Sequence, residues 1–370
     1  MSTFRIPMSF PDITEEDVQA VAEVVRSGRL ALGPKTEAFE RQLAAYVGAR
    51  YAIAVNSGTA ALHLLVRALG LGPGDEVLVP SFTFVASVNV LLYERVKPVF
   101  VDIEPDTYNL DPNDLERKIT PRTKGIMVVD VFGHPAEWDA ILAIAEEHGL
   151  VVIDDACEAL GAEYKGKKLG TFGDAAAFAF YPNKQMTTGE GGMIVTDRED
   201  IARLTRSMRN QGRGEMGAWL EHERLGYNYR MTEMSAALGL SQLQRLEHLL
   251  ARRARVAQMY TERLKGLDWL RTPVVRPYVR MSWFVYVITL SEGLHRDPLM
   301  KALARKGIPT RGYFSPVHLQ PYIRQMLGTH EAMLPVTESV AQRTVALPFH
   351  ANLSEQEIDV VVEALKEWSP

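Results

Sequence analysis

The stretch Val151-Val152-Ile153-Asp154-Asp155-Ala156-Cys157-Glu158 begins as an uninterrupted apolar run and continues directly into two aspartates. A strand without polar alternation is typical of a sheet that helices cover on both faces. Such sheets are mostly parallel, and open α/β sheets bind ligands beyond the carboxyl ends of their strands. We therefore expect an α/β fold in which one of these aspartates points into a ligand cleft.

Most of the other strand candidates have the same apolar character. The segments between them include crossover helices at 60–69, 136–148 and 198–209, and a helix opens at Thr14 and closes at Gly28. Together with 151–154, the strand candidates predict a mainly parallel, seven-stranded sheet between helices. They lie at 51–55, 76–80, 99–101, 125–129, 175–180 and 192–196.

The pattern changes in the last third of the chain. A single long helical stretch is expected from about Thr232 to Leu264, followed by a strand at 284–290 and by helices that start near Asp297 and Ser354. This order predicts a smaller α+β module. We therefore divide the chain into an N-terminal helical segment (1–30), a large α/β domain (31–245) and a small C-terminal domain (246–370).

The composition excludes several classes of protein. The 370 residues are 46% hydrophobic and 24% charged, with a net charge of −5 and both signs well mixed, so no basic face predicts binding to nucleic acid or an anionic membrane. The single cysteine, Cys157, excludes an internal disulfide and suits a reducing compartment. No apolar run reaches membrane-spanning length. We expect a cytoplasmic protein.

The run from Phe178 to Lys184 passes from an apolar strand into a Gly-rich turn that ends at Gly192. A lysine at a strand end can be partly desolvated in a cleft, which lowers its pKa and frees its amine to attack carbonyl groups. A solvated loop lysine is the alternative, and it would be favoured if Lys184 stood alone.

A second stretch, 55–62, joins a strand to a helix in a form that suits a phosphate. Ser57 is a good N-cap, Gly58 permits close backbone approach, and Thr59 adds a hydroxyl donor beside the free N–H groups of the helix start. A plain turn is the alternative. The rival phosphate loop at 161–168 lacks the Ser or Thr that would hold magnesium, and we interpret it as a solvated turn.

Further candidates follow other strands. One of the two aspartates, 154 or 155, could hold a pyridine nitrogen protonated, while a helix-capping role for Asp155 is the alternative. Metal ligation by the paired carboxylates is less attractive because the nine histidines form no HExxH or comparable cluster, and we predict no metal. Phe84 could stack on a flat heteroaromatic ring or belong to the core. The loop 226–232 suits contact with a ligand or a neighbouring subunit.

These motifs, in this order, resemble the DegT/DnrJ/EryC1/StrS family of sugar aminotransferases, which are pyridoxal-phosphate enzymes of fold type I. The motifs are Asn56-Ser57-Gly58-Thr59, the stretch 154–158, the stretch 183–192 and the loop 226–232. The resemblance extends from Gly33 to the region of His318. It implies a fold type I architecture and pyridoxal 5′-phosphate as the cofactor.

The resemblance assigns roles residue by residue. Lys184 would bind the cofactor covalently and later carry the proton. Asp155 would pair with the pyridine nitrogen, and Phe84 would stack on the ring. Gly58 and Thr59 would bind the phosphate.

Two positions depart from the family pattern. Glu158 stands near the cofactor's ring hydroxyl, where many relatives have glutamine or histidine. Ala179 stands where many relatives have a phosphate-binding serine, so Asn183 or a partner subunit's loop would have to compensate. Asn228 would reach the phosphate in the other subunit, which implies a homodimer with shared active sites.

The resemblance also indicates the reaction. Members that dehydrate sugars carry histidine in place of Lys184, so the lysine favours transamination. We expect glutamate as amino donor and a nucleotide-linked 4-keto-6-deoxyhexose as acceptor, with Arg230, Tyr313 and His318 as candidate sugar or diphosphate contacts. His318 could equally be a satisfied loop histidine. A keto-cyclitol aminotransferase and a non-catalytic regulator that binds a sugar nucleotide are the alternatives.

Overall fold

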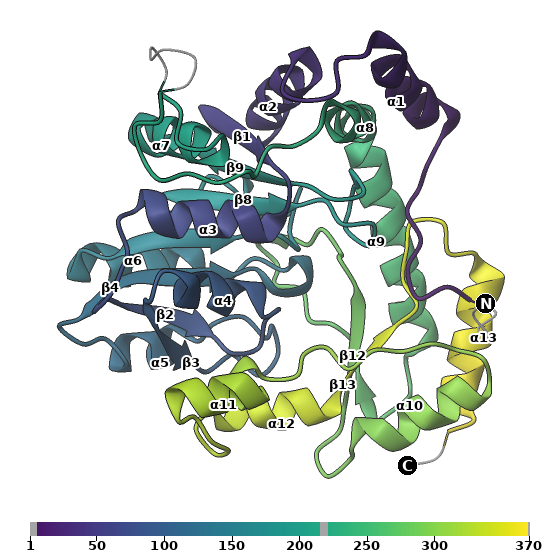
Figure 1. The fold of residues 1–370 in the computed structure, drawn as a ribbon. Coiled ribbons are helices and arrows are strands. Elements are labelled where there is room, and N and C mark those ends of the chain that lie inside the picture. Colours follow the sequence, from purple (N-terminus) through teal and green to yellow (C-terminus); the bar gives the residue numbers. More distant parts are fainter. Residues whose placement is uncertain (1–5, 215–220, 369–370) are drawn as a thin grey trace.

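A computed structural model describes residues 6–214 and 221–368. Its centre is a seven-stranded sheet of order β1-β9-β8-β5-β4-β2-β3, in which only β9 runs antiparallel to its neighbours (Figure 1). The predicted mainly parallel sheet is therefore confirmed. Its strands are β1 (Tyr51–Val55), β2 (Glu76–Pro80), β3 (Lys97–Val101), β4 (Thr123–Val129), β5 (Val151–Asp155), β8 (Ala175–Ala179) and β9 (Gly192–Thr196).

Two separate apolar clusters cover the two faces of this sheet. Along β4, Ile126 and Val128 belong to one cluster while Met127 between them belongs to the other. Side chains on both faces of the sheet are therefore buried, which explains why these strands show no alternation of apolar and polar residues. One face packs against α3 (Gly58–Ala68), α4 (Ala86–Tyr93) and α7 (Glu199–Arg209), and the other against α2 (Pro34–Val47), α5 (Pro112–Arg117), α6 (Trp138–His148) and α8 (Glu233–Gln244).

The C-terminal part has its own apolar cluster around a small antiparallel sheet (Figure 1). The sheet has the order β10-β12-β13, with β10 (Leu270–Arg271), β12 (Tyr286–Leu290) and β13 (Thr344–Leu347). The expected α+β character is thus present, while the division at 30 and 245 stays a prediction. The helices of this part are α9 (Leu246–Arg263), α10 (Arg296–Arg305), α11 (Pro321–Leu327), α12 (Pro335–Arg343) and α13 (Glu355–Lys366).

The prediction of one long helix from Thr232 to Leu264 is wrong. The helix breaks at Arg245, whose backbone has φ −114° and ψ 14°, so that α8 and α9 are separate helices. The Arg245 guanidinium binds the carboxylates of Asp12 and Asp17, which come from the N-terminal segment and α1 (Glu15–Ser27). The break depends on contacts distant in sequence, and no glycine or proline marks it.

The segment 161–168 forms a small hairpin. Strands β6 (Glu163–Tyr164) and β7 (Lys167–Lys168) pair antiparallel on either side of a turn, and β11 (Val279–Arg280) adds a third strand to β6. The interpretation as a turn was therefore right at Lys165 and Gly166 but missed the strands beside it. Among the described residues, no helix combines the length and the apolar character that crossing a membrane requires.

Candidate active site

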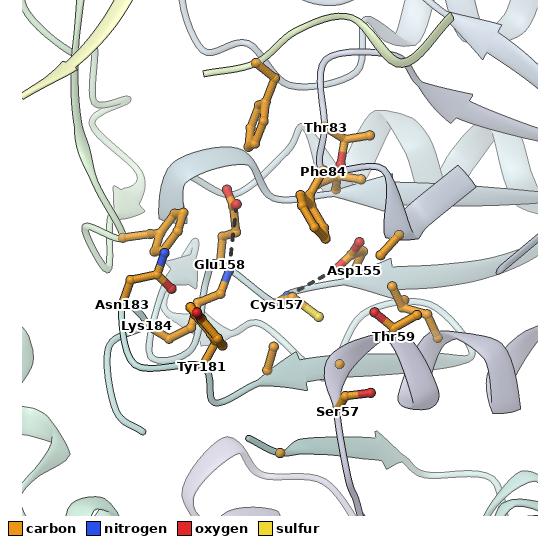
Figure 2. A pocket seen from close by; sticks show the side chains of 18 of the residues that line it. Ser57, Thr59, Thr83, Phe84, Asp155, Cys157, Glu158, Tyr181, Asn183 and Lys184 are labelled. Atoms are coloured by element: carbon orange, nitrogen blue, oxygen red, sulfur yellow. Dashed lines mark hydrogen bonds and ion pairs between the residues drawn. The ribbon is translucent and has the colours of Figure 1, made fainter. Parts of the chain in front are cut away.

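A cavity of about 510 Å³ lies at the carboxyl ends of β1, β2, β5 and β8, where an open α/β sheet binds its ligands. Figure 2 shows its side chains converging from the start of α3, the end of β5 and the loop after β8. Its far wall comes from the C-terminal part of the chain. The cavity lining includes Ser57, Gly58, Thr59, Phe84, Asp155, Cys157, Glu158, Ala179, Asn183, Lys184, Phe284, Tyr313 and Phe314.

Lys184 points into this cavity from the turn that follows β8. Its backbone N–H donates to the carbonyl of Tyr181 at 2.9 Å, which closes the turn, and its side chain is only 13% exposed. The ammonium nitrogen lies 3.8 Å from Oε1 of Glu158 (Figure 2). It also lies 4.0 Å from the ring centroid of Phe284. The alternative of a solvated loop lysine is therefore wrong.

Glu158 is a buried carboxyl group held from two sides. Its Oε2 accepts a hydrogen bond from the Phe132 N–H at 2.9 Å, and its Oε1 faces the Lys184 ammonium. Burial raises the pKa of Glu158, while the positive charge of Lys184 and the Phe132 N–H act in the opposite direction. Glu158 can therefore exchange a proton within the site more readily than an exposed glutamate can.

Asp155 stands at the end of β5 with both carboxylate oxygens engaged. Oδ2 accepts from the Ser87 hydroxyl at 2.7 Å, and Oδ1 accepts from the Cys157 N–H at 3.2 Å. The Cys157 contact is a local turn interaction, and no described helix begins between β5 and β6, so the alternative that Asp155 caps a helix is wrong. These two bonds fix the orientation of a carboxylate that lines the cavity.

Phe84 presents an aromatic face to the cavity. The residue is 62% exposed, so the alternative that it belongs to the core is wrong. Figure 2 shows the ring near Asp155, on the wall opposite the Lys184 side of the cavity. An exposed ring beside an oriented carboxylate suits a flat, protonated heterocycle.

The start of α3 supplies hydrogen-bond donors that the chain itself does not use. The Ser57 hydroxyl accepts from the Ala60 N–H at 3.1 Å and begins the helix. Within the described residues, the N–H groups of Gly58 and Thr59 have no acceptor. A Cβ atom on Gly58 would lie 2.7 Å from Cβ of Ala179 and 3.0 Å from Sγ of Cys157, so only glycine fits here.

This set of groups fits pyridoxal phosphate. An amine, an oriented carboxylate, an exposed aromatic face and two free N–H groups at a helix start line one cavity. Figure 2 shows Asn183 on the Lys184 side, away from Ser57 and Thr59, and its buried Oδ1 has no partner among the described residues. Asn183 is therefore poorly placed to replace the serine hydroxyl that Ala179 lacks.

Three predicted site residues lie outside the cavity lining, while Tyr313 belongs to it. Asn228 is exposed and forms a β-bridge with Asn210, and Arg230 donates to Oδ1 of Asn210 at 3.0 Å. His318 is 0% exposed, and its ring nitrogens contact the Ser81 hydroxyl at 2.7 Å and the Glu338 carboxylate at 3.2 Å. The expected sugar contact at His318 is corrected to a satisfied, buried histidine.

Of the far wall of the cavity, the sequence predicted Tyr313 alone. Phe284 and Phe314 line it, and Arg253 holds it in place from behind. Phe284 and Phe314 lie 100 or more residues from Lys184 and are ordinary core residue types, and Arg253 lies on α9, outside every motif that the sequence offered. Only the packing of the C-terminal part against the sheet could reveal them.

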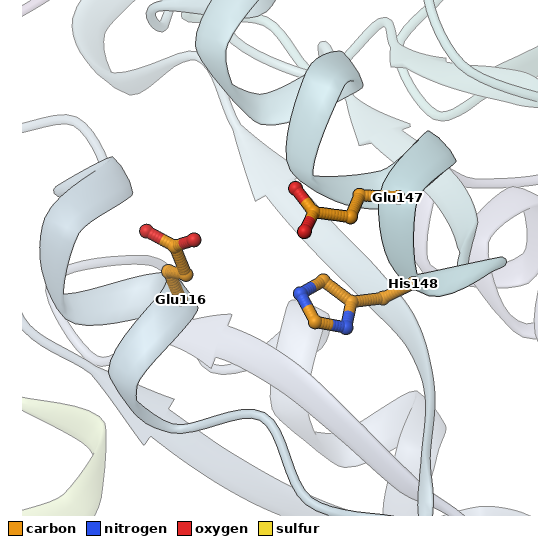
Figure 3. Close-up of side chains that lie close together, drawn as sticks. All are labelled: Glu116, Glu147 and His148. Carbon is orange, nitrogen blue, oxygen red and sulfur yellow. The ribbon is translucent and has the colours of Figure 1, made fainter.

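A second cluster of possible ligand groups lies on the surface. Figure 3 shows Glu116 of α5 together with Glu147 and His148 of α6, whose ligand atoms lie within 4.8 Å of one another. All three are exposed, and nothing else in the described structure points to an ion there. The prediction that the protein has no metal site stays a prediction.

Comparison with known proteins agrees with this geometry. The model of the DegT/DnrJ/EryC1/StrS aminotransferase family matches residues 11–366. GDP-perosamine synthase from Caulobacter vibrioides is 44% identical over 336 residues, which cover 89% of this chain and 88% of that protein.

Solved structures are similar over almost the whole chain. DesV from S. venezuelae is 38% identical with a TM-score of 0.91, covering 95% of this chain and 94% of that one. The pyridoxal-phosphate form of Spr1654 from Streptococcus pneumoniae, a putative sugar aminotransferase by its description, is 31% identical with a TM-score of 0.93, covering 98% and 100%. Fold and sequence therefore agree over both parts of the chain.

Proposed function

Because the chain belongs to the DegT/DnrJ/EryC1/StrS aminotransferase family, we propose that this pyridoxal-phosphate-dependent enzyme transfers an amino group from glutamate to a nucleotide-linked 4-keto-6-deoxyhexose. Family membership establishes an aminotransferase of amino-sugar biosynthesis. The observation that carries the proposal is one cavity lined by the Lys184 amine, the Asp155 carboxylate and the exposed Phe84 ring. The motif 183–192 resembles that of the C4-aminating members, which supports the choice of sugar.

The chain's own residues would hold the cofactor at three points. Asp155 would keep the ring nitrogen protonated, Phe84 would cover one face of the ring, and the free N–H groups of Gly58 and Thr59 would bind the phosphate. When bound, pyridoxal phosphate supplies the electron sink that allows a proton to leave the carbon bearing the amino group.

Lys184 would move that proton with its Nζ atom. An amine can accept a proton only after it has lost one, and Glu158 lies 3.8 Å away as the nearest carboxylate. Burial of Glu158 raises its pKa, so its carboxylate can take up and return a proton in this position. Phe284 would keep water from the amine by covering it with an apolar ring.

The two substrates would use the cavity in turn. Glutamate would leave its amino group behind and depart as 2-oxoglutarate before the keto-sugar enters, so we expect ping-pong kinetics. Tyr313, on the cavity wall, and Arg230, outside it, remain candidate contacts for the sugar or its diphosphate.

We also infer a homodimer in which Asn228 of the partner subunit completes the phosphate end. Two observations support this inference. Asn228 is exposed and outside its own chain's cavity, and the phosphate end of that cavity offers backbone donors beside Ala179, which has no hydroxyl. Sedimentation of the purified protein would test the dimer, and a monomer with full activity would contradict it.

A panel of acceptors tests the proposed reaction. The purified holoenzyme and glutamate are incubated with nucleotide-linked 4-keto and 3-keto sugars and, in parallel, with keto-cyclitols, and amino products are identified by mass spectrometry. We expect amination of a nucleotide-linked 4-keto-6-deoxyhexose. Amination of keto-cyclitols alone would assign the enzyme to that class instead. Absence of any spectral change with glutamate would indicate a regulator without turnover.

A further inference from the structure

Arg253, on α9, is a buried guanidinium with no carboxylate partner among the residues that the structure describes. The residue is 3% exposed, and within residues 6–214 and 221–368 its hydrogen bonds all go to backbone carbonyl groups. Burial lowers the pKa of Arg253 to about 10, so it stays charged at neutral pH. A buried charge is costly and persists only where its surroundings satisfy it.

The guanidinium binds two separate segments of the cavity wall. One nitrogen, Nη2, donates to the carbonyl of Lys184 at 2.8 Å and to that of Asn183 at 3.4 Å. The other, Nη1, donates to the carbonyls of Trp283 and Phe284 at 3.1 and 3.2 Å. The planar fork of arginine can serve two groups in fixed directions at once, which a lysine cannot do.

Both segments determine the surroundings of the Lys184 amine. The ring centroid of Phe284 lies 4.0 Å from Nζ of Lys184. The Arg253 guanidinium therefore binds the backbone of the lysine and also the backbone of the phenylalanine whose ring contacts the lysine ammonium. Trp283 has a φ of 55°, a conformation that large residues rarely adopt, and its carbonyl is one of the four that Arg253 binds. Arg253 therefore stabilises an otherwise unfavourable path of the chain beside the site.

We propose that Arg253 is a positioning residue of the aminotransferase reaction, which fixes the Lys184 amine against Phe284 by tying the loop after β8 to the segment before β12. The inference rests on the proposed role of Lys184 as the reacting amine. Arg253 does not line the cavity and acts only through the two segments that it binds.

The test compares Arg253→Met and Arg253→Lys with the control Arg255→Met. Arg255 lies on the same helix but is exposed and pairs with Glu355 at 3.0 Å, away from the cavity. The apoprotein of each variant is mixed with pyridoxal phosphate, and the rate of covalent capture is followed by the visible absorbance band across pH. Borohydride trapping and peptide mass spectrometry confirm attachment to Lys184.

We expect Arg253→Met to capture the cofactor about 10²-fold more slowly than wild type, since misplacement by about 1 Å costs that much in well-oriented reactions. The pH midpoint of the band should also shift. Arg253→Lys should be intermediate, because it keeps the charge but loses the fork, and Arg255→Met should behave as wild type.

A merely structural role would lower the melting temperature of Arg253→Met and leave the capture rate and the pH midpoint equal to those of Arg255→Met, which would overturn the proposal. If Arg253→Met does not fold, Arg253→Lys decides, and capture at the wild-type rate would overturn it. Capture needs only Lys184 and the cofactor. If the proposed sugar is not aminated, the expected capture rates therefore stay the same. A wrong substrate and a wrong role for Arg253 thus give different results.

Discussion

The two ends of the cavity are built in different ways. At the lysine end, Lys184 is 13% exposed, and its ammonium contacts the Glu158 carboxylate and the Phe284 ring. At the phosphate end, the start of α3 offers the N–H groups of Gly58 and Thr59, which have no partner within the described residues. At the lysine end the contacts of the reacting amine are already formed. At the phosphate end, the N–H donors would be satisfied only by a group that binds there.

This difference predicts which changes affect chemistry and which affect retention of the cofactor. Groups that are already satisfied and buried lose most when they are removed, because nothing replaces them. Backbone donors at a helix start tolerate changes nearby unless their geometry is disturbed.

Replacing Lys184 with alanine should abolish the chemistry of the lysine end. We expect the glutamate half-reaction to slow by about 10³-fold or more, because both the covalent link and the proton carrier are lost. Stopped-flow absorbance measures the half-reaction, and circular dichroism with sedimentation serves as the control for folding. Turnover within tenfold of wild type would show that Lys184 is not the reacting amine.

Replacing Gly58 with alanine should damage the phosphate end and spare the lysine end. The added Cβ would meet Ala179 at 2.7 Å and Cys157 at 3.0 Å, so the start of α3 must move. Overpacking of this kind costs about 1–3 kcal/mol, which corresponds to up to about 10²-fold in affinity for pyridoxal phosphate.

Equilibrium dialysis with pyridoxal phosphate and with phosphate-free pyridoxal separates the two ends in Gly58→Ala. We expect the affinity for pyridoxal phosphate to fall and that for pyridoxal to change little. An equal loss for both ligands would contradict the assignment of the α3 start to the phosphate.

The same contrast explains what could be predicted from sequence. Lys184, Asp155 and Gly58 follow buried strands directly, and the carboxyl ends of neighbouring strands meet at one edge of the sheet, so local pattern was enough to bring them together. Phe284 and Arg253 reach the site only through the packing of the C-terminal part, which leaves no local signal. The sequence left both roles of His318 open, because a histidine in a loop looks the same whether Ser81 and Glu338 satisfy it or a ligand does.

The helix break at Arg245 was invisible for a related reason. The apolar periodicity of 232–264 continues through it, and the partners that hold it, Asp12 and Asp17, are more than 200 residues away. Sequence pattern thus predicted the elements and the strand-end residues well. It could not predict features that depend on charged groups meeting across the fold.

Replacing Asp154 with asparagine tests the stability of the central sheet, because Asp154 lies in β5 next to the cavity residue Asp155. Asp154 and Asp130 are fully buried, and burial raises the pKa of Asp130 to about 6 and that of Asp154 well above its usual value. Both folded-state pKa values exceed the unfolded values, so their contribution to stability is complete below about pH 4 and is lost as the pH rises through the folded values.

An amide at position 154 cannot ionise, can donate to Asp130 and can still accept from the Gly170 N–H, which now donates to Asp154 at 3.1 Å. We expect the free energy of unfolding of Asp154→Asn at pH 8 to rise by about 1 kcal/mol, with a smaller change at pH 5. Urea unfolding at both pH values measures this, with the exposed Asp139→Asn as control. A loss of stability at pH 8 would show that ionisation of Asp154 does not destabilise the fold.

The smallest expected effect comes from adding a donor to the phosphate end with Ala179→Ser. Cβ of Ala179 lies against Gly58, so the added hydroxyl would stand beside the free N–H groups of α3. One new hydrogen bond to a charged phosphate gives about 1 kcal/mol, or about fivefold tighter binding of pyridoxal phosphate and no tightening of pyridoxal. Unchanged affinity for both would mean that another group, such as Asn228 of the partner subunit, already fills this place. The anchoring end would then be as complete as the lysine end, but only in the assembled dimer.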